Sequence, residues 1–368
     1  PFESELSALL NMYLPGQAGG EATAQLLFGE KNPSGKLAET WVKSYDVVPF
    51  GNEFVQSKED YYQESIFVGY RYYDQISQDQ ILYPFGYGLS YTHFSYENPN
   101  VKNDGKFIVV NCEIHNRGNF EGAEIVQVYI GGPSTNVFKP IKELRGYKKI
   151  YIAKGELESI TIKIPIEELA YYNTSVGDWV VENGEYQIYI ASSSQDIRHM
   201  LTVSIYGYKE TKSPYIPKEL PHYFEPKNLS KLTKQEFQKL LGRKLPELKQ
   251  ISRYTMDSKL VDLRSSLVGK IFYSAVVGVG KKQYEKALKM PDGPEKDMNR
   301  KNGMFIMKMM PNNSLRSMSV SSSGRFSYNV ALGLVDILNN QYISGFKKIL
   351  KKTKVPNLPN SIRKSDKE

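Results

Sequence analysis

The sequence predicts a multidomain chain with a partial α/β segment, then an all-β sandwich, then a mostly α-helical tail. Three observations predict this order. Apolar residues recur at helical spacing before residue 30, about seven short strand-like runs lie between residues 97 and 208, and helical patterns fill the remainder. The 368 residues are 40% hydrophobic and 24% charged, which suits about two to three domains with buried cores.

The first part, residues 1–96, is expected to be the end of a larger α/β domain followed by an aromatic linker. Apolar residues over 6–13 predict a helix, which Pro15 and Gly16 would end. A second apolar stretch over 22–28 predicts another helix, closed by Gly29. Because about 45 residues cannot bury enough apolar surface to fold alone, we expect the rest of this domain to lie elsewhere.

Residues 61–96 are unusually rich in tyrosine and phenylalanine. Large side chains alternate over residues 66–73, which predicts a strand with bulky residues on both faces. Such aromatic residues fill ordinary interfaces, and they also stack on sugar rings. Composition alone favours core packing and leaves sugar contact open.

Residues 97–208 are expected to form the β-sandwich. Strand-like runs, separated by turns containing Gly, Asn or Pro, cover Phe107–Ile114, Ile125–Ile130, Gly146–Ile152, Ser159–Ile164, Trp179–Val181, Tyr186–Ala191 and Leu201–Ile205. Cys112 lies inside one of these patterns, so we interpret it as a buried apolar residue and not as a reactive thiol.

A Pro- and Lys-rich linker is predicted over residues 209–228, a basic helical extension over 229–355, and a disordered tail over 356–368. The capping box that begins at Thr233 predicts a helix that Gly242 would stop. Further helices are expected over 258–288 and 329–340.

Charge is divided unevenly along the chain. Residues 1–208 contain 16 Lys and Arg against 26 Asp and Glu, whereas residues 209–368 contain 32 against 14. The basic tail could bind nucleic acid, an anionic surface or the acidic body of the same chain. The plainer interpretation is a solvated helical face, because Lys-rich helices usually face water.

Several classes of protein and site are excluded or disfavoured. No uncharged apolar run reaches the roughly 18 residues that span a bilayer, and one cysteine cannot form an intramolecular disulfide or a multi-thiolate zinc site. No phosphate loop or dinucleotide turn is present, and we predict no cofactor. The histidines have no metal-ligand spacing and are expected to have structural or surface roles: His93, His115, His199 and His222.

Ordered motifs in residues 1–207 resemble glycoside hydrolase family 3. The α/β part carries YLPGQAGGEA at 13–22, LFGEKNPSGKL at 27–37, YQESIFVGYRYYD at 62–74 and PFGYGLSYT at 84–92. The β part is similar to the fibronectin-III-like, immunoglobulin-type sandwich of that family, with GAEIVQVYI at 122–130 and ELRGY at 143–147. The basic tail is similar to an extension found on some bacterial members.

The resemblance implies the C-terminal part of a retaining, exo-acting β-glycosidase, most commonly a β-glucosidase that removes terminal non-reducing β-glucosyl residues. Xylosidase and hexosaminidase relatives remain open. Such enzymes use two carboxylates about 5–5.5 Å apart. In this family the nucleophilic Asp belongs to an N-terminal β/α barrel and the acid–base Glu precedes the motifs found here, so the chain alone is expected to be inactive.

Glu64 is the one acid–base candidate inside the chain. It could also pair with Arg71 or cap a turn, or shape the aglycone side of the pocket together with Tyr62 and Arg71. Asp46 and Asp74 are interpreted as structural carboxylates. A catalytic Glu64 would need burial to raise its pKa and access to a glycosidic oxygen.

The loop with Gln17, Gly19 and Gly20 could expose backbone towards the barrel, although turn geometry alone explains the glycines. The rival function is a non-catalytic carbohydrate- or partner-binding module with a basic tail. We expect a β-glucoside or oligosaccharide substrate and a possible homodimer, and neither a membrane nor nucleic acid as a partner. The chain begins without Met, which we interpret as truncation; its single cysteine favours the cytoplasm.

Overall fold

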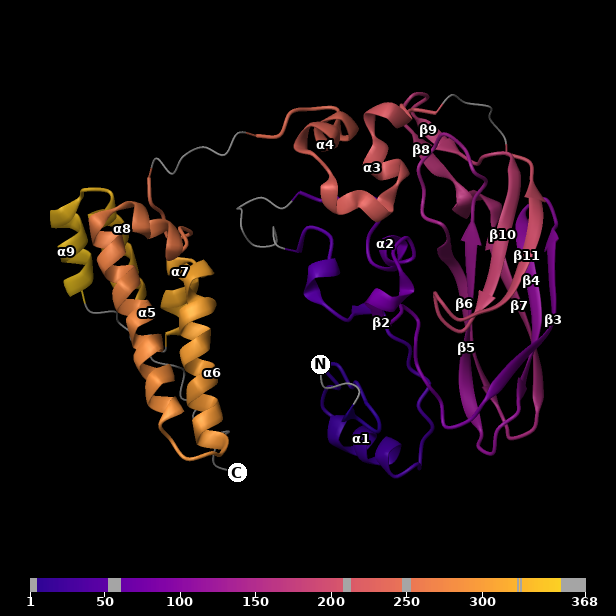
Figure 1. The fold of residues 1–368 in the computed structure, drawn as a ribbon, viewed down its shortest axis with the longest axis horizontal. Coiled ribbons are helices and arrows are strands. Elements are labelled where there is room, and N and C mark those ends of the chain that lie inside the picture. The colour runs from indigo at the N-terminus through magenta and orange to yellow at the C-terminus, as the bar shows by residue number, and fades with distance from the viewer. Residues whose placement is uncertain are drawn as a thin grey trace, which may run out of the picture. The chain divides into compact units, whose positions relative to one another are not determined.

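The computed structural model describes residues 5–51, 61–207, 213–246, 253–322, 324 and 326–351. The chain divides into two compact units, Pro1–Leu245 and Pro246–Glu368, here called the N-terminal and C-terminal units (Figure 1). Each has its own hydrophobic core. The predicted tail over 356–368 lies outside the described residues.

A β-sandwich forms the largest part of the N-terminal unit. Its three-stranded sheet has the order β3-β4-β7, and its four-stranded sheet the order β11-β10-β5-β6, with every neighbouring pair antiparallel. The strands are β3 Phe94–Asn103, β4 Phe107–Asn116, β5 Gly122–Gly131, β6 Glu143–Ile152, β7 Leu157–Pro165, β10 Gly184–Ala191 and β11 Ile197–Ile205.

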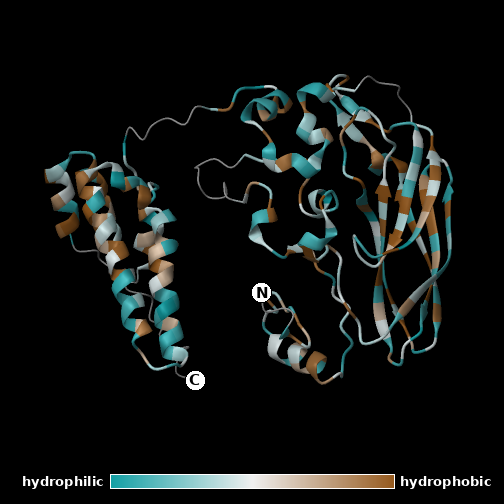
Figure 2. Cartoon of the chain, viewed as in Figure 1, coloured by the Kyte–Doolittle hydropathy of each residue, from teal (hydrophilic) through white to brown (hydrophobic). Residues whose placement is uncertain are grey.

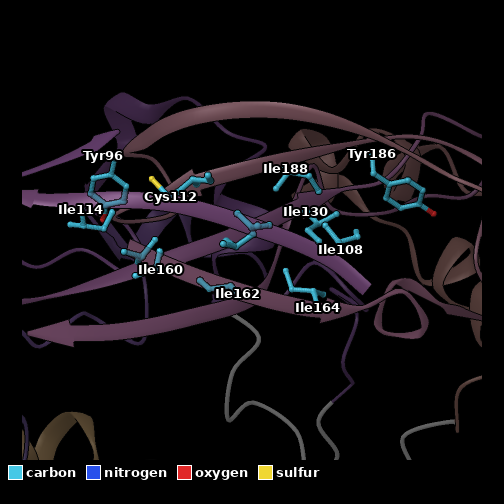
Figure 3. Close-up of a cluster of buried hydrophobic side chains, with 14 of the residues drawn as sticks. Tyr96, Ile108, Cys112, Ile114, Ile130, Ile160, Ile162, Ile164, Tyr186 and Ile188 are labelled. Carbon is cyan, nitrogen blue, oxygen red and sulfur yellow. The ribbon is translucent and has the colours of Figure 1, made fainter. Parts of the chain in front are cut away.

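The sandwich core is built from strand residues of alternating polarity, visible as alternating colours along the arrows (Figure 2). In β4 every second side chain is buried, from Ile108 through Cys112 to Ile114. These meet isoleucines of β7, β5 and β10 between the two sheets (Figure 3), and Ile188 is 0% exposed. The predicted burial of Cys112 is therefore confirmed.

All seven predicted strand-like runs coincide with strands of this domain. The structure adds β3 and β8 Tyr171–Asn173, which the sequence analysis did not predict. β8 forms a small hairpin with β9 Asp178–Val180, the strand that the run Trp179–Val181 predicts. β3 was missed because polar residues interrupt its apolar pattern, and a register shift between Glu97 and Asn100 breaks its alternation.

The α/β segment contains little regular structure. It consists of α1 Gly19–Leu27, β1 Trp41–Val42, a 3₁₀ turn Tyr45–Val47, α2 Tyr70–Tyr73, a 3₁₀ turn Gln78–Gln80, and β2 Ile81–Tyr83, which pairs antiparallel with β1. α1 agrees with the predicted second helix. It buries only Gly19, and Leu27 and Phe28 are 66% and 82% exposed.

Two predictions in this segment are wrong. Residues 6–18 form no helix or strand. Their leucines and Tyr13 remain largely exposed among the described residues, and a short helix without packing is unstable. Residues 66–73 form turns and one helical turn instead of a strand. Gly69 takes a positive φ of 58° and redirects the chain, and α2 then buries all three of its tyrosines.

The predicted linker over 209–228 also differs from the structure, which describes residues 213–228 as packed against the N-terminal unit. The elements here are a 3₁₀ turn Pro217–Glu219, α3 Pro221–Phe224, a 3₁₀ helix Pro226–Lys231 and α4 Lys234–Leu241. Tyr223 and Leu229 are fully buried in a core shared with Phe67 and Phe138. The Pro-rich composition suggested a linker. The aromatic and leucine side chains of this segment are instead buried in the N-terminal unit.

α4 begins and ends where the sequence predicts. The Thr233 side chain accepts a hydrogen bond from the Glu236 amide, and Gly242 adopts the left-handed conformation at the C-cap.

The C-terminal unit is helical in its described part. It contains a 3₁₀ helix Val261–Ser265, α5 Leu267–Leu288, α6 Pro294–Lys308, a 3₁₀ turn Met310–Asn312, α7 Leu315–Ser321, α8 Tyr328–Leu338 and α9 Tyr342–Leu350. The helix predicted over 258–288 starts later, at Leu267, and α8 agrees with the helix predicted over 329–340. In the described ranges, no helix is both long and apolar enough to cross a bilayer.

Glycines set the closest helix contacts of this unit. A Cβ added to Gly303 of α6 would lie 2.8 Å from the Gly280 carbonyl oxygen of α5. One added to Gly345 of α9 would lie 2.6 Å from the Gly333 carbonyl oxygen of α8. Both helix pairs therefore pack backbone against backbone, at positions where any larger residue would push the helices apart.

Candidate functional site

Residues 61–69 carry the exposed part of the predicted site. Phe67 is fully buried, and the Tyr223 hydroxyl donates to the Gln63 carbonyl at 2.8 Å, so the loop is held at both points. Tyr62 is 77% exposed. Ile66 and Val68 are also exposed. The loop therefore presents a tyrosine and two aliphatic side chains on a buried anchor.

Glu64 does not pair with Arg71. The Arg71 Nε donates to Glu143 Oε1 at 2.8 Å, and the guanidinium lies 5.1 Å from the centroid of the Tyr70 ring. Glu143 also accepts from Arg145 at 2.5 Å. Of the alternatives for Glu64, a pair with Arg71 is therefore wrong, because Arg71 is held by Glu143 of β6. Within the described residues the Glu64 carboxylate has no ion pair, and its carbonyl accepts from the Phe67 amide at 2.9 Å.

Asp74 is a structural carboxylate, as predicted. Its Oδ2 lies 2.6 Å from the Lys142 ammonium nitrogen, and the side chains are 4% and 9% exposed. Burial raises the pKa of Asp74, and the neighbouring Lys142 charge acts against that rise. The Lys142 ammonium also lies 5.9 Å from the Tyr129 ring centroid. The pair thus joins α2 to the start of β6. Asp46 accepts from the Ser44 hydroxyl at 3.0 Å within a local turn.

Asn32, in the NPSGKL motif, joins three segments. Its Oδ1 accepts from the Ser90 hydroxyl and from the Tyr91 amide, each at 2.9 Å, and its Nδ2 donates to the Glu121 carbonyl at 2.9 Å. The LFGEKNPSGKL motif is thereby fixed to the PFGYGLSYT motif and to the start of β5. Tyr91 adds a hydrogen bond from its hydroxyl to the Leu26 carbonyl at 2.8 Å, which anchors the end of α1.

Gln127 on β5 also connects distant segments, and we call Asn32 and Gln127 the two joints of the N-terminal unit. Its Nε2 donates to the Gly86 carbonyl at 3.1 Å and to the Ser192 carbonyl at 2.6 Å. Gly86 has a φ of 79°, and a Cβ there would lie 2.2 Å from the Gln127 Oε1. Only glycine fits this close approach. Lys36 adds a partly buried contact, 3.1 Å from Glu124 and 3.0 Å from the Gly88 carbonyl.

The loop around Gln17 has a local explanation. Gly19 begins α1, its amide donates to the Gly16 carbonyl at 3.3 Å, and a Cβ there would lie 2.6 Å from the Pro15 ring. Space is open around Gly20. Packing against Pro15 therefore accounts for Gly19, and a role of Gln17 and Gly20 towards a barrel stays a prediction.

The histidines occupy separate places. His199 Nε2 lies 2.8 Å from the Tyr96 carbonyl, and His222 Nδ1 lies 2.6 Å from Glu236 Oε2. His115 lies 3.9 Å from Glu97, and His93 is exposed. Among the described residues no group of three His, Cys, Asp or Glu side chains is placed to hold a metal ion.

Sequence reasoning missed three residues that connect distant segments: Asn32, Lys36 and Gln127. All three lie inside quoted motifs, but their partners are 41 to 89 residues away along the chain. The available signal was the motif itself, which marks a position without indicating what it contacts.

Comparisons with known proteins agree with the motifs. A family model for the glycosyl hydrolase family 3 C-terminal domain matches residues 1–91, and one for a fibronectin type III-like domain matches residues 124–194. The chain belongs to glycoside hydrolase family 3. The two joints, Asn32 and Gln127, therefore connect the family 3 C-terminal domain to its fibronectin-III-like neighbour.

This family 3 chain is similar to the thermostable β-glucosidase B of Acetivibrio thermocellus, at 35% identity over 350 residues, covering 92% of this chain and 39% of that protein. A β-glucosidase of Kluyveromyces marxianus is 36% identical over 218 residues, covering 58% of this chain and 25% of that protein. The chain thus spans between a quarter and two fifths of the length of these relatives.

Solved structures agree. A β-glucosidase from Kluyveromyces marxianus superposes with a TM-score of 0.53 at 34% identity, covering 55% of this chain and 25% of that one. A β-glucosidase from Streptomyces venezuelae in complex with D-glucose gives 0.52 at 34% identity, covering 56% and 27%.

Proposed function

We propose that the chain is the C-terminal part of a retaining, exo-acting β-glucosidase that releases terminal non-reducing β-glucosyl residues. The β-glucosidase relatives and the family assignment support this reaction class. A retaining glycosidase needs a nucleophilic carboxylate and an acid–base carboxylate about 5–5.5 Å apart. We place both groups outside these 368 residues, so the chain alone does not catalyse hydrolysis.

The observation that carries this proposal is that the buried carboxylates contact basic side chains. Within the described part of the N-terminal unit, well-buried carboxylates contact basic side chains in the pairs Asp74–Lys142, Glu124–Lys36 and Glu236–His222. A general acid needs a proton at neutral pH and reach to a leaving oxygen. A carboxylate that is buried and held by a basic side chain does not reach a leaving oxygen, so we interpret these three groups as structural.

Within the whole enzyme, we propose that this part braces the catalytic domain and shapes the mouth of its pocket. The exposed loop over residues 61–69 supports that role, because Tyr62 extends from a backbone that Phe67 anchors. Glu64 and Arg71 would contribute shape and charge on the aglycone side. The proposed partner is a β-glucoside or oligosaccharide, and a homodimer stays a prediction.

Hydrolysis of nitrophenyl β-glucoside by the purified 368-residue chain tests the proposal. We expect no nitrophenol above a heat-inactivated control. Turnover that a Glu64→Gln variant loses and a Glu21→Gln variant keeps would contradict it, because Glu21 is an exposed carboxylate on α1. Glu64 would then be the acid–base residue. Saturable binding of cellobiose without turnover, unchanged in Tyr62→Ala, would favour the rival function of a separate carbohydrate-binding module.

A further inference from the structure

We propose that helix α9 docks the C-terminal unit on an anionic membrane surface, with its axis in the plane of the lipid headgroups. This role is independent of the proposed glycosidase reaction. It concerns the attachment of the chain to a surface, and it requires no helix that crosses the bilayer.

One side of α9 packs on the unit, and its other side is exposed among the residues that the structure describes. Gly345 packs against the Gly333 backbone of α8, and Ile349 lies over Gly333 on the same side. The remaining apolar side chains are more than half exposed: Tyr342 51%, Ile343 77%, Phe346 58% and Leu350 81%. Because steps of three and four residues return to one face of a helix, the last three form a continuous apolar stripe.

Basic residues lie beside this stripe. Lys347 and Lys351 are exposed, and helical spacing places both at one edge of the stripe. Lys348 lies on the inner side, 2.7 Å from Asp336. Residues 253–351 contain 17 Lys and Arg against 7 Asp and Glu, so the whole unit attracts anionic surfaces.

An anionic bilayer matches both features. Its headgroup region attracts the lysines, and its acyl boundary takes up an apolar stripe to a depth of about 5–10 Å. Nucleic acid would use the lysines and leave the stripe in water. Helix α9 of a second copy would cover the stripe, but it would bring two strongly basic C-terminal units together. Lipid is therefore the partner that satisfies charge and hydrophobicity together.

Vesicle flotation of the complete 368-residue chain tests this docking. We expect flotation with vesicles of phosphatidylcholine mixed with phosphatidylglycerol, and little with phosphatidylcholine alone or at high salt. Phe346→Ser should lower the partition coefficient about tenfold, because it removes a large apolar contact. The double variant Lys347→Glu, Lys351→Glu should lower it at low salt.

Ile271→Ser is the matched control, because Ile271 is 64% exposed on α5, outside the proposed contact. Circular dichroism verifies that each variant keeps its helices. Three results would each overturn the proposal: no flotation with anionic vesicles, equal loss in Phe346→Ser and Ile271→Ser, or a dimer in sedimentation velocity that Phe346→Ser abolishes. The last result would assign α9 to a contact between copies.

Discussion

The β-sandwich and the C-terminal helical unit pack their elements together in different ways. In the sandwich, branched side chains from two sheets fill the interior, and Ile108, Ile114 and Ile188 are fully buried. In the helical unit, glycines bring backbones together, and Gly303 and Gly345 sit where a methyl group would collide. The sandwich interior therefore depends on side-chain volume, whereas the α5–α6 and α8–α9 contacts depend on positions without a side chain.

The comparison explains why the helical unit leaves more apolar surface in water. Helices that touch through glycine backbone use only a narrow strip of their circumference, so residues on the far side remain exposed, as in α5 and α9. In a sheet, every second side chain of each strand points to the same face, so one complete face can be buried. The size of a substituted side chain should therefore have opposite effects on stability in the two regions. A smaller side chain should destabilise the sandwich, and a larger one should destabilise the helical pairs.

The largest effect is expected from Ile188→Ala in the sandwich. Ile188 is 0% exposed, so its truncation should lower the free energy of unfolding by about 3 kcal/mol, through lost burial and a residual cavity. Urea denaturation followed by circular dichroism measures this. Ile188→Val, which removes one methylene, should cost about 1 kcal/mol.

Labelling of the single cysteine shows whether the lost stability belongs to the sandwich. Cys112 is buried in the sandwich core, and burial raises the pKa of its thiol, so a thiol reagent reacts with it only when the sandwich opens. Ile188→Ala should speed Cys112 labelling, and substitutions in the helical unit should not. An unchanged labelling rate in Ile188→Ala would contradict the assignment of its effect to the sandwich.

An intermediate effect, with a sign change, is expected for two glycines of the helical unit. Gly303→Ala should lower the free energy of unfolding by about 2 kcal/mol, because its methyl would lie 2.7 Å from the Tyr284 amide nitrogen. Gly278→Ala on α5 is the matched control. Nothing lies within 4 Å of its added Cβ, so alanine should raise stability by up to about 1 kcal/mol. Equal effects in the two variants would refute packing through glycine in this pair.

The smallest effect concerns acid stability of the helical unit. Hydrogen bonds from Lys348 and from the Ser344 hydroxyl lower the pKa of Asp336. A carboxyl with a lowered folded-state pKa stabilises the fold above its ordinary pKa near 4, and this contribution disappears as the pH falls through the folded-state value. The melting temperature of Asp336→Asn should therefore fall less on acidification than that of the original chain. Parallel pH profiles would contradict this.

The difference between the regions also governed what the sequence could predict. Alternation over β4 and β7 predicted these strands, because each face is buried or exposed as a whole. α6 and α9 were not predicted, since Gly303 and Gly345 interrupt their apolar periodicity at the very positions that pack them. The alternation over residues 66–73 was too short to compete with the turn at Gly69.

The site was predictable in outline and not in its contacts. The motifs located the segments around Tyr62 and Glu64, but the partner of Arg71 is Glu143, 72 positions further along the chain. No local pattern indicates which of many carboxylates an arginine will meet. The same holds for Gln127, whose bonds cross to Gly86 and Ser192.

The joints of the N-terminal unit have a consequence for how this protein can vary. Asn32 and Gln127 bind mostly main-chain groups: the Tyr91 amide and the Glu121, Gly86 and Ser192 carbonyls. A side chain that recognises backbone is indifferent to the neighbour's side chain, so those neighbours can drift while the path of the chain is kept. At these two joints the contact between the domains therefore depends on the path of the backbone more than on the identity of the neighbouring side chains.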